Sequence, residues 1–178
     1  MSASSFEIHE LELPGVFLIQ PKRWDDNRGF FVETFHQEVL AAAGITHSFV
    51  QDNLSFSKKN VLRGLHFQKA PHAQAKLVRC VSGAILDVIA DHTRNSQTFG
   101  KHIAVELSGE KQNMLYVPDN YLHGFCVLSD EALVEYKVSD YYHPECVSGV
   151  HYNSPTLGIV WPVADPILSK QDMELPTL

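Results

Sequence analysis

Side chains that can move a proton or hold a negative charge recur in strand-like parts of this chain, at His66, Lys76, His123 and Tyr136. An imidazole titrates near neutral pH, so a histidine here can remove a proton from a carbon beside a carbonyl group. The enolate that results needs a fixed cation or hydrogen-bond donor, which Lys76 and His123 can supply. Inversion also needs an acid on the opposite face, for which Tyr136 is available. The alternative for Tyr136 is an ordinary strand tyrosine that only packs in the core.

Metal chemistry matches these positions less well. None of the ten histidines forms an HxH pair, and the residue two places after His66 is Gln68. Two imidazoles, an amide and an ammonium make a poor divalent site, because Lys76 repels a cation. A cation in this place favours a site that binds or creates an anion. The other histidines are expected at the surface or in hydrogen bonds: His9, His36, His47, His72, His92, His102, His143 and His151.

Composition narrows the class of protein. The 178 residues are 44% apolar and 20% charged, which is typical of a soluble protein with one domain, here residues 1–178. A formal net charge of -7 argues against binding to a nucleic-acid backbone. No secretory signal or membrane-spanning apolar run is visible, and Cys80, Cys126 and Cys146 lack disulfide or zinc spacing. We therefore expect a cytoplasmic protein with free thiols and no nucleic-acid or membrane partner.

The elements that hold these side chains are mostly short strands. One helix is expected, because Thr34 and Gln37 form a capping-box pattern before EVLAAA, and Gly44 stands where a helix would end. The expected strands are 16–20, 30–33, 49–54, 61–68, 74–81, 84–90, 103–107, 114–117, 124–128 and 133–139. The proline-rich stretch from Trp161 onward should be irregular. This pattern predicts an all-β sandwich or barrel with a few short helices.

The order of these segments resembles the two motifs of the cupin superfamily, whose fold is a double-stranded β-helix, or jelly-roll barrel. Metal-binding cupins carry two histidines and a carboxylate in the first motif and another histidine in the second. This chain has Gln68 in place of the second histidine and offers Lys76 where the carboxylate is expected. The resemblance therefore implies the barrel without its metal.

In finer detail the chain resembles the dTDP-4-dehydrorhamnose 3,5-epimerase family, from about Leu13 to Asp172. The matching pieces are 26–33, 51–55, 63–68, 74–79, 118–125, 135–137, 161–162 and 169–172. Each piece alone is weak, but their joint order and spacing are specific. The resemblance implies an isomerase that inverts C3, C5 or both in a dTDP-linked 4-keto-6-deoxyhexose.

The resemblance also implies a role for each catalytic position. His66 resembles the base that removes the proton at C3 or C5, and Asp172 resembles the carboxylate that orients it. Tyr136 resembles the acid that returns a proton from the other face. Lys76 and His123 resemble the residues around the C4 ketone and its enolate. No metal or organic cofactor is implied, because the ketone of the substrate is itself the electron sink.

Further positions resemble substrate-binding residues. Arg63, Gln51 and Asn53 match contacts to the sugar and the diphosphate. Arg28 and Glu33 match positions that meet the nucleotide, and in this family that region lies across a homodimer interface. The resemblance therefore implies a nucleotide-diphosphate sugar as ligand and a second copy of the chain as partner.

The match departs from the family pattern near the nucleotide. Val147 stands where the family usually has a glutamate, and Gln171 stands where a lysine or arginine usually precedes the aspartate. The proton-transfer positions are intact. The sequence therefore predicts the reaction class, and it leaves open the nucleotide base and the number of inverted carbons.

The role implied for Arg63 requires an irregular backbone between Arg63 and His66. In a regular strand Arg63 and His66 have opposite parity and face opposite sides of the sheet. Both can reach one pocket only if the strand is irregular between them, and Gly64 is the expected place. An Arg63 side chain pointing away from His66 into solvent would contradict its phosphate role.

Four other functions fit parts of the pattern. A sugar 3,4-ketoisomerase uses a related barrel and similar enolate chemistry, and a single-centre epimerase shares the catalytic residues. A metal-dependent cupin such as a dioxygenase is disfavoured by Gln68 and Lys76. A non-catalytic sugar-nucleotide cupin would bind its ligand without exchanging protons. The presence of both His66 and Tyr136 favours the epimerase.

Overall fold

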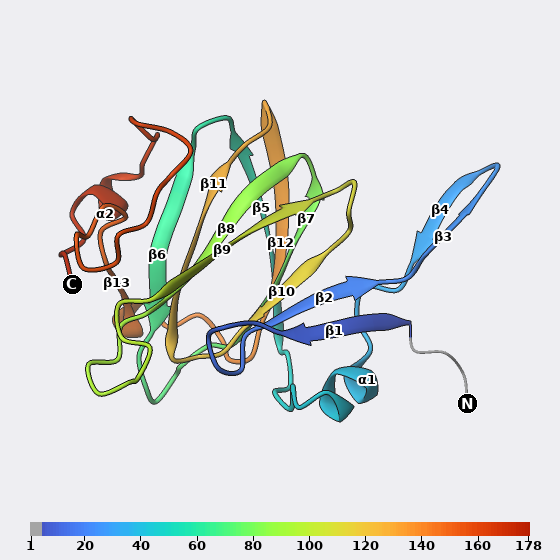
Figure 1. The fold of residues 1–178 in the computed structure, drawn as a ribbon, viewed down its shortest axis with the longest axis horizontal. Coiled ribbons are helices and arrows are strands. Elements are labelled where there is room, and N and C mark those ends of the chain that lie inside the picture. Colours follow the sequence, from blue (N-terminus) through green and yellow to red (C-terminus); the bar gives the residue numbers. More distant parts are fainter. Residues whose placement is uncertain (1–4) are drawn as a thin grey trace.

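The computed structural model describes residues 5–178 of the chain. Two antiparallel sheets face each other and form a barrel (Figure 1). The six-stranded sheet has the order β1–β2–β10–β7–β12–β5, and the five-stranded sheet has the order β13–β6–β11–β8–β9. This is the all-β jelly-roll architecture that the sequence predicted.

The bounds of the elements are as follows. The strands are β1 (Phe6–Glu10), β2 (Phe17–Pro21), β3 (Arg23–Asp26), β4 (Gly29–Val32), β5 (Gln51–Lys58), β6 (Leu62–Gln68), β7 (Lys76–Ser82), β8 (Ala84–Asp91), β9 (His102–Ser108), β10 (Met114–Val117), β11 (Tyr121–Val127), β12 (Glu131–Val138) and β13 (Val147–Gly149). The helices are α1 (Gln37–Ala42), the short 3₁₀ helix η1 (Pro144–Cys146) and α2 (Lys170–Met173). None of these helices is long and apolar enough to cross a membrane.

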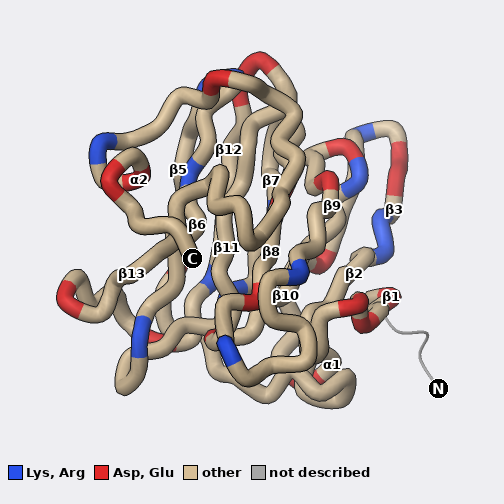
Figure 2. Tube along the Cα trace, turned by 60° about the vertical axis from the view of Figure 1, so that its left-hand side comes forward, with Lys and Arg blue, Asp and Glu red and all other residues tan. Residues whose placement is uncertain are grey.

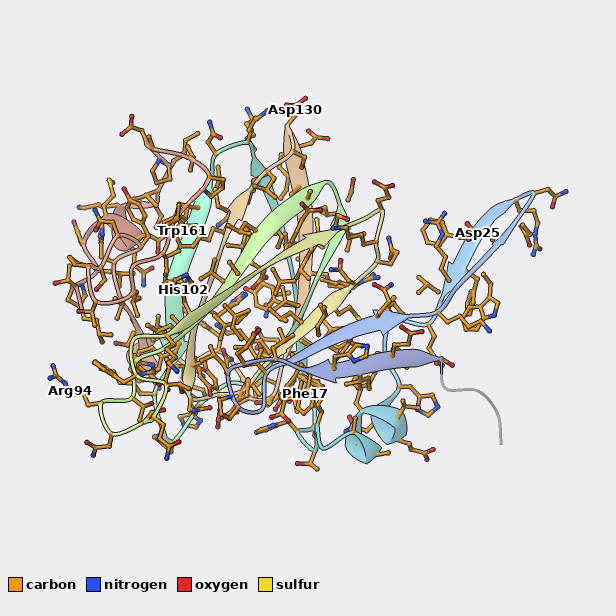
Figure 3. All side chains as sticks on the ribbon, viewed as in Figure 1. Phe17, Asp25, Arg94, His102, Asp130 and Trp161 are labelled. Carbon is orange, nitrogen blue, oxygen red and sulfur yellow. The ribbon has the colours of Figure 1, made fainter. Side chains whose placement is uncertain are left out.

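Apolar side chains from both sheets fill one part of the barrel, as the stick view shows (Figure 3). Val78 and Val134 come from the six-stranded sheet, and Ile85 and Phe125 come from the five-stranded sheet. Along β12 every second side chain from Ala132 onward points into the barrel, because successive residues of a strand face opposite sides. Tyr136 has the inward parity and packs against this core.

The β3–β4 hairpin, called the arm below, projects away from the barrel (Figure 1). Figure 2 shows residues of both charge signs along it, and Figure 3 labels Asp25 on it. The arm exposes the aromatic side chains of Trp24, Phe30 and Phe31 to solvent. Arg23 pairs with Asp25 at 2.7 Å and lies over the Phe30 ring. The arm therefore makes its own local contacts and leaves an aromatic surface uncovered.

Most of the expected strands are present, with ends shifted by a few residues. The sequence analysis missed β1, β3 and β13, which are short or rich in charged residues. Helix α1 also forms, and Gly44 follows its end with a φ of 95°. The capping-box interpretation is wrong, because His36 is the N-cap residue and Thr34 lies outside the helix.

The segment after Trp161 is largely irregular, as expected, but contains α2. Ser169 caps this short helix by accepting a hydrogen bond from the backbone N–H of Asp172. The Trp161 indole N–H donates to the Tyr152 carbonyl oxygen at 2.9 Å (labelled in Figure 3). Figure 1 shows the segment lying along β6, so a residue from the last part of the chain reaches the barrel mouth.

The irregularity expected at Gly64 is confirmed. His66 pairs with His123 of β11 and Arg63 pairs with Phe125, so β6 carries an extra residue between these pairs. Gly64 has a φ of 121°, and a Cβ there would lie 2.6 Å from the Cα of Gly124. Only glycine fits this conformation and this approach. The shift lets Arg63 and His66 line the same cavity.

Candidate active site

A cavity of about 490 Å³ opens between the two sheets at one end of the barrel. Its wall includes catalytic and binding residues expected from the sequence, namely His66, Lys76, Tyr136, Asp172, Arg63 and His123. Strands β6 and β11 supply one wall, and β5, β7 and β12 supply the other. Helix α2 closes a third side with Asp172. Residues that are far apart in the sequence therefore meet in one cavity.

His66 and Asp172 form a hydrogen-bonded pair. A carboxylate can only accept, so the His66 Nε2–H donates to Asp172 Oδ1, over 2.5 Å. Burial raises the pKa of Asp172, but hydrogen bonds with His66 and Ser169 and the charge of His66 outweigh it and leave the pKa below its usual value. The ionised carboxylate therefore holds the proton on Nε2 and leaves Nδ1 of His66 with a lone pair.

His123 and Asp87 form a second pair on the same sheet. His123 Nε2–H donates to Asp87 Oδ1 over 2.7 Å, and the Asp87 side chain is fully buried. The other oxygen, Oδ2, has no hydrogen-bond partner among residues 5–178. Since His123 lies directly opposite His66 in the β6–β11 register, two imidazoles, each held by a carboxylate, stand side by side in the cavity wall.

The sequence analysis assigned no role to Asp87. A signal was present, because Asp87 is a carboxylate in the apolar run of β8, and such groups are rarely buried without a partner. Its partner His123 is 36 residues away in sequence, so the pairing itself could not be derived from spacing.

Lys76 supplies one of two positive charges that residues 5–178 place in the cavity lining, and Arg63 supplies the other. The Lys76 ammonium donates to the His66 carbonyl oxygen over 3.4 Å. Burial lowers the pKa of Lys76 to about 8, and the negative charge of Asp87 opposes this change. Lys76 is therefore mostly protonated at neutral pH and can hold an oxyanion, while a modest rise in pH would discharge it.

Tyr136 stands on the wall opposite His66. It lies on β12 of the six-stranded sheet, whereas His66 lies on β6 of the five-stranded sheet. Burial raises the pKa of Tyr136, and the nearby Arg63 partly offsets this effect. The phenol therefore keeps its proton at neutral pH and is suited to act as an acid.

Arg63 also faces into the cavity, so its predicted orientation is correct. Its Nε–H donates to the Ser57 hydroxyl over 3.0 Å, and its Nη2 donates to the Phe56 carbonyl oxygen over 3.3 Å. These contacts with β5 hold the guanidinium at the edge of the cavity, where an anionic group of a ligand would meet it.

Gln51 and Asn53 lie next to the cavity and do not line it. Both belong to β5, which also carries Ser55, and Ser55 does line the cavity. The Gln51 amide donates to Asn53 Oδ1 over 2.9 Å and accepts from the Tyr142 backbone N–H over 3.2 Å. Because Tyr142 is part of the lining, these amides support the rim.

Arg28 and Glu33 do not line the cavity of their own chain. Arg28 lies at the turn of the arm, with its side chain 85% exposed and paired with Asp26 at 2.6 Å. Glu33 follows the end of β4, is partly buried and does not line the cavity. A nucleotide contact from either residue would therefore have to be made outside the molecule's own cavity.

The donor set of the cavity fits a metal poorly. The Gln68 side chain is buried, donates to the Tyr141 carbonyl oxygen over 3.0 Å and accepts from the His143 N–H over 2.9 Å. Its oxygen and nitrogen are thus occupied by the backbone, and Lys76 places a cation beside His66. This chemistry disfavours a divalent ion between His66 and His123.

The comparisons with known proteins identify one protein family. The family model described as dTDP-4-dehydrorhamnose 3,5-epimerase matches residues 10–178. A Shigella flexneri protein of that name is 47% identical over 163 residues, which cover 91% of this chain and 90% of that protein.

Solved structures agree. The Bacillus anthracis dTDP-4-dehydrorhamnose 3,5-epimerase, with TDP and PPi bound, is 44% identical with a TM-score of 0.94, covering 97% of this chain and 99% of that one. A Legionella pneumophila dTDP-6-deoxy-D-glucose-3,5-epimerase, in complex with dTDP-4-keto-L-rhamnose, is 41% identical with a TM-score of 0.93, covering 97% and 92%.

Proposed function

Because the chain belongs to the dTDP-4-dehydrorhamnose 3,5-epimerase family, an isomerase family, we propose that it inverts C3 and C5 of a dTDP-4-keto-6-deoxyhexose. One observation carries the mechanism. His66, held by Asp172, and Tyr136 stand on opposite walls of a single cavity that also contains the Lys76 ammonium. A base and an acid on opposite faces of a flat intermediate are what inversion requires.

The reaction proceeds through an enolate. Nδ1 of His66 removes the proton from the carbon beside the C4 ketone, and the electron pair of the C–H bond moves onto the ketone oxygen. The Lys76 ammonium stabilises this oxyanion, and His123, held by Asp87, lines the same part of the cavity. Tyr136 then gives its proton to the opposite face of the same carbon, and the electron pair on oxygen re-forms the ketone. His66 then releases the proton that it took, and Tyr136 regains one from solvent, so that the same steps can act on the second carbon, because both C3 and C5 are adjacent to C4.

NMR in D₂O with dTDP-4-keto-6-deoxyglucose tests this function. The ring positions C3 and C5 should both acquire deuterium, and the product should carry the inverted configuration at both. Deuterium at only one position would identify a single-centre epimerase. Conversion to a 3-keto sugar would identify a ketoisomerase, and ligand binding without exchange would contradict catalysis altogether.

The pKa of Lys76 predicts an alkaline limit to activity. With that pKa at about 8, the ammonium is present below this pH and is lost above it, so kcat/KM should fall as the pH rises through about 8. In Lys76→Arg the cation persists at high pH, so the alkaline fall in kcat/KM should shift to a higher pH. The longer side chain should nevertheless lower the rate. Lys76→Met should lose about 10²–10³-fold below about pH 8, and the difference from the wild type should shrink above that pH, where the wild type loses its own ammonium. An unchanged alkaline fall in Lys76→Arg would show that another group sets it.

We further propose that the arm completes the cavity of a second copy in a homodimer. This accounts for Arg28, which is exposed far from its own cavity, and for the uncovered aromatic surface of Trp24, Phe30 and Phe31. An arm that crosses to a symmetric partner would bury these rings and carry Arg28 and Glu33 to the nucleotide.

Complementation between two impaired variants tests this arrangement. Arg28→Ala and His66→Ala should each have little activity with subsaturating substrate when expressed separately. In a co-expressed mixture, half of the dimers are mixed and each has one intact site, so about a quarter of the wild-type activity should return. The Arg28→Ala/His66→Ala double variant mixed with either single variant is the control. No gain over the separate variants would mean that Arg28 acts within its own chain or not at all.

A further inference from the structure

A cluster of metal-binding side chains lies outside the catalytic group, at the rim of the barrel. It consists of His72, Asp140 and His143, whose ligand atoms all lie within 4.8 Å of one another. His72 comes from the loop between β6 and β7, and the other two come from the connection between β12 and η1. The cluster is partly exposed, so an ion can reach it from solvent.

The donor set suits zinc. Two imidazoles and one carboxylate with an open fourth position form a common zinc site, with bonds of about 2.0–2.2 Å. Tetrahedral ligands at that distance stand about 3.4 Å apart, so a pair of ligand atoms at the 4.8 Å limit has to approach by about 1.4 Å, and the 3.0 Å hydrogen bond between His72 Nδ1 and Asp140 has to give way to bonds with the ion. Glu145 adds a feature typical of such sites, because it accepts a hydrogen bond from His143 Nδ1 over 3.0 Å. That contact fixes the tautomer and leaves Nε2 of His143 free to bind.

The backbone that carries the ligands is already fixed. The buried Gln68 amide donates to the carbonyl oxygens of His72 and Tyr141 and accepts from the N–H of His143. One side chain therefore ties the loop of His72 to the segment of Asp140 and His143. Contraction around an ion requires rotation of side chains and little movement of the main chain.

The two imidazole rings of the cluster have to rotate in order to bind one ion. The His72 and His143 rings are stacked, with centroids 3.5 Å apart and an angle of 9° between their planes. A bound ion lies in the plane of each imidazole, so both rings have to turn out of this stack. Their side chains are 35% and 30% exposed, which leaves room for that rotation.

The charges of the cluster also favour a divalent cation. Asp140 and Glu145 each bring a carboxylate to the imidazoles, at 3.0 Å from His72 Nδ1 and 3.0 Å from His143 Nδ1. No ion pair with Lys or Arg compensates either carboxylate among residues 5–178.

We propose that His72, Asp140 and His143 bind Zn²⁺ at the rim, apart from the catalytic residues. The cluster is connected to the cavity through Tyr142, which lies between Asp140 and His143 in the sequence and lines the cavity wall. A bound ion clamps the 140–143 segment to the loop of His72 and so stabilises the rim on which Tyr142 stands. It takes no part in proton transfer.

Calorimetric titration of the chelator-treated protein with Zn²⁺ tests the site. We expect one tight site in the wild type, at least about tenfold weaker binding in His143→Asn and Asp140→Asn, and a smaller loss in Glu145→Gln. His151→Asn is the matched control, since His151 is partly exposed, bonded to Asn153 and outside the cluster. Circular dichroism checks that each variant is folded.

The outcomes separate clearly. Loss of binding in the cluster variants with retention in His151→Asn supports the site. Absence of binding by the wild type, or binding that is the same in all variants, overturns it. Because the readout is metal affinity, the result does not depend on whether the epimerase reaction is assigned correctly.

Discussion

His66→Ala should lower turnover of dTDP-4-keto-6-deoxyglucose by about 10²–10⁴-fold, the usual contribution of a general base. The variant should also stop deuterium from entering the sugar in D₂O, since no other imidazole in the cavity is held by Asp172. Affinity for dTDP should be retained, because the positions proposed to bind the nucleotide are unchanged. The rate of exchange by NMR and the affinity by calorimetry measure these effects separately.

A second substitution at His66 tests whether a loss of activity comes from a loss of folding. Removing the imidazole leaves the buried Asp172 carboxylate without its main partner, which could loosen α2. His66→Gln retains an amide donor for Asp172 but has no base at neutral pH, so it should be as inactive as His66→Ala and more stable. Exchange at the wild-type rate in either variant would remove His66 from the role of base.

Tyr136→Phe should separate the two halves of the reaction. The ring still packs against the core, so folding should be preserved, but the acid on the second wall is gone. We expect formation of the inverted product to fall by about 10²–10⁴-fold. Deuterium should still enter the unreacted sugar, because His66 can remove a proton and return a deuteron to the same face. NMR of the remaining substrate and of the product distinguishes exchange from inversion.

Tyr152→Phe serves as the control for Tyr136→Phe. Tyr152 is half-buried in the segment after β13, where its carbonyl oxygen accepts from Trp161, and it lies outside the cavity lining. It should behave as the wild type in both assays. If Tyr136→Phe inverts its substrate at the wild-type rate, the proton must come from another group, and the two-wall mechanism fails.

Much of this arrangement could be predicted because the chain resembles a known family. That resemblance and the chemistry of the side chains led us to expect His66, Lys76 and Tyr136 in one pocket, and the structure places all three in the lining of one cavity. The irregularity at Gly64 was also predictable, because the role that the resemblance implies for Arg63 conflicts with the alternation of a regular strand.

Other features depend on contacts that a single sequence does not specify. The Asp87–His123 hydrogen bond connects two neighbouring strands, β8 and β11, that are far apart in sequence. The short strand β13 forms by pairing with the edge of β6. The cap of α1 was misread because Thr34 continues an extended segment, so that the chain turns two residues later than the pattern suggested. Arg28 was matched to a nucleotide-binding position, but the arm that carries it was not predicted, because β3 is short and rich in charged residues.

The contact between Gly64 and Gly124 bears on how this enzyme could be re-engineered. A Cβ at position 124 would lie 2.6 Å from the Arg63 carbonyl oxygen, just as one at position 64 would meet Gly124. Libraries that randomise these two positions should therefore yield mainly misfolded clones, whatever substrate is selected for. Substitutions are better directed to Val147 and Gln171, which line the same cavity but take no part in the close contact between β6 and β11.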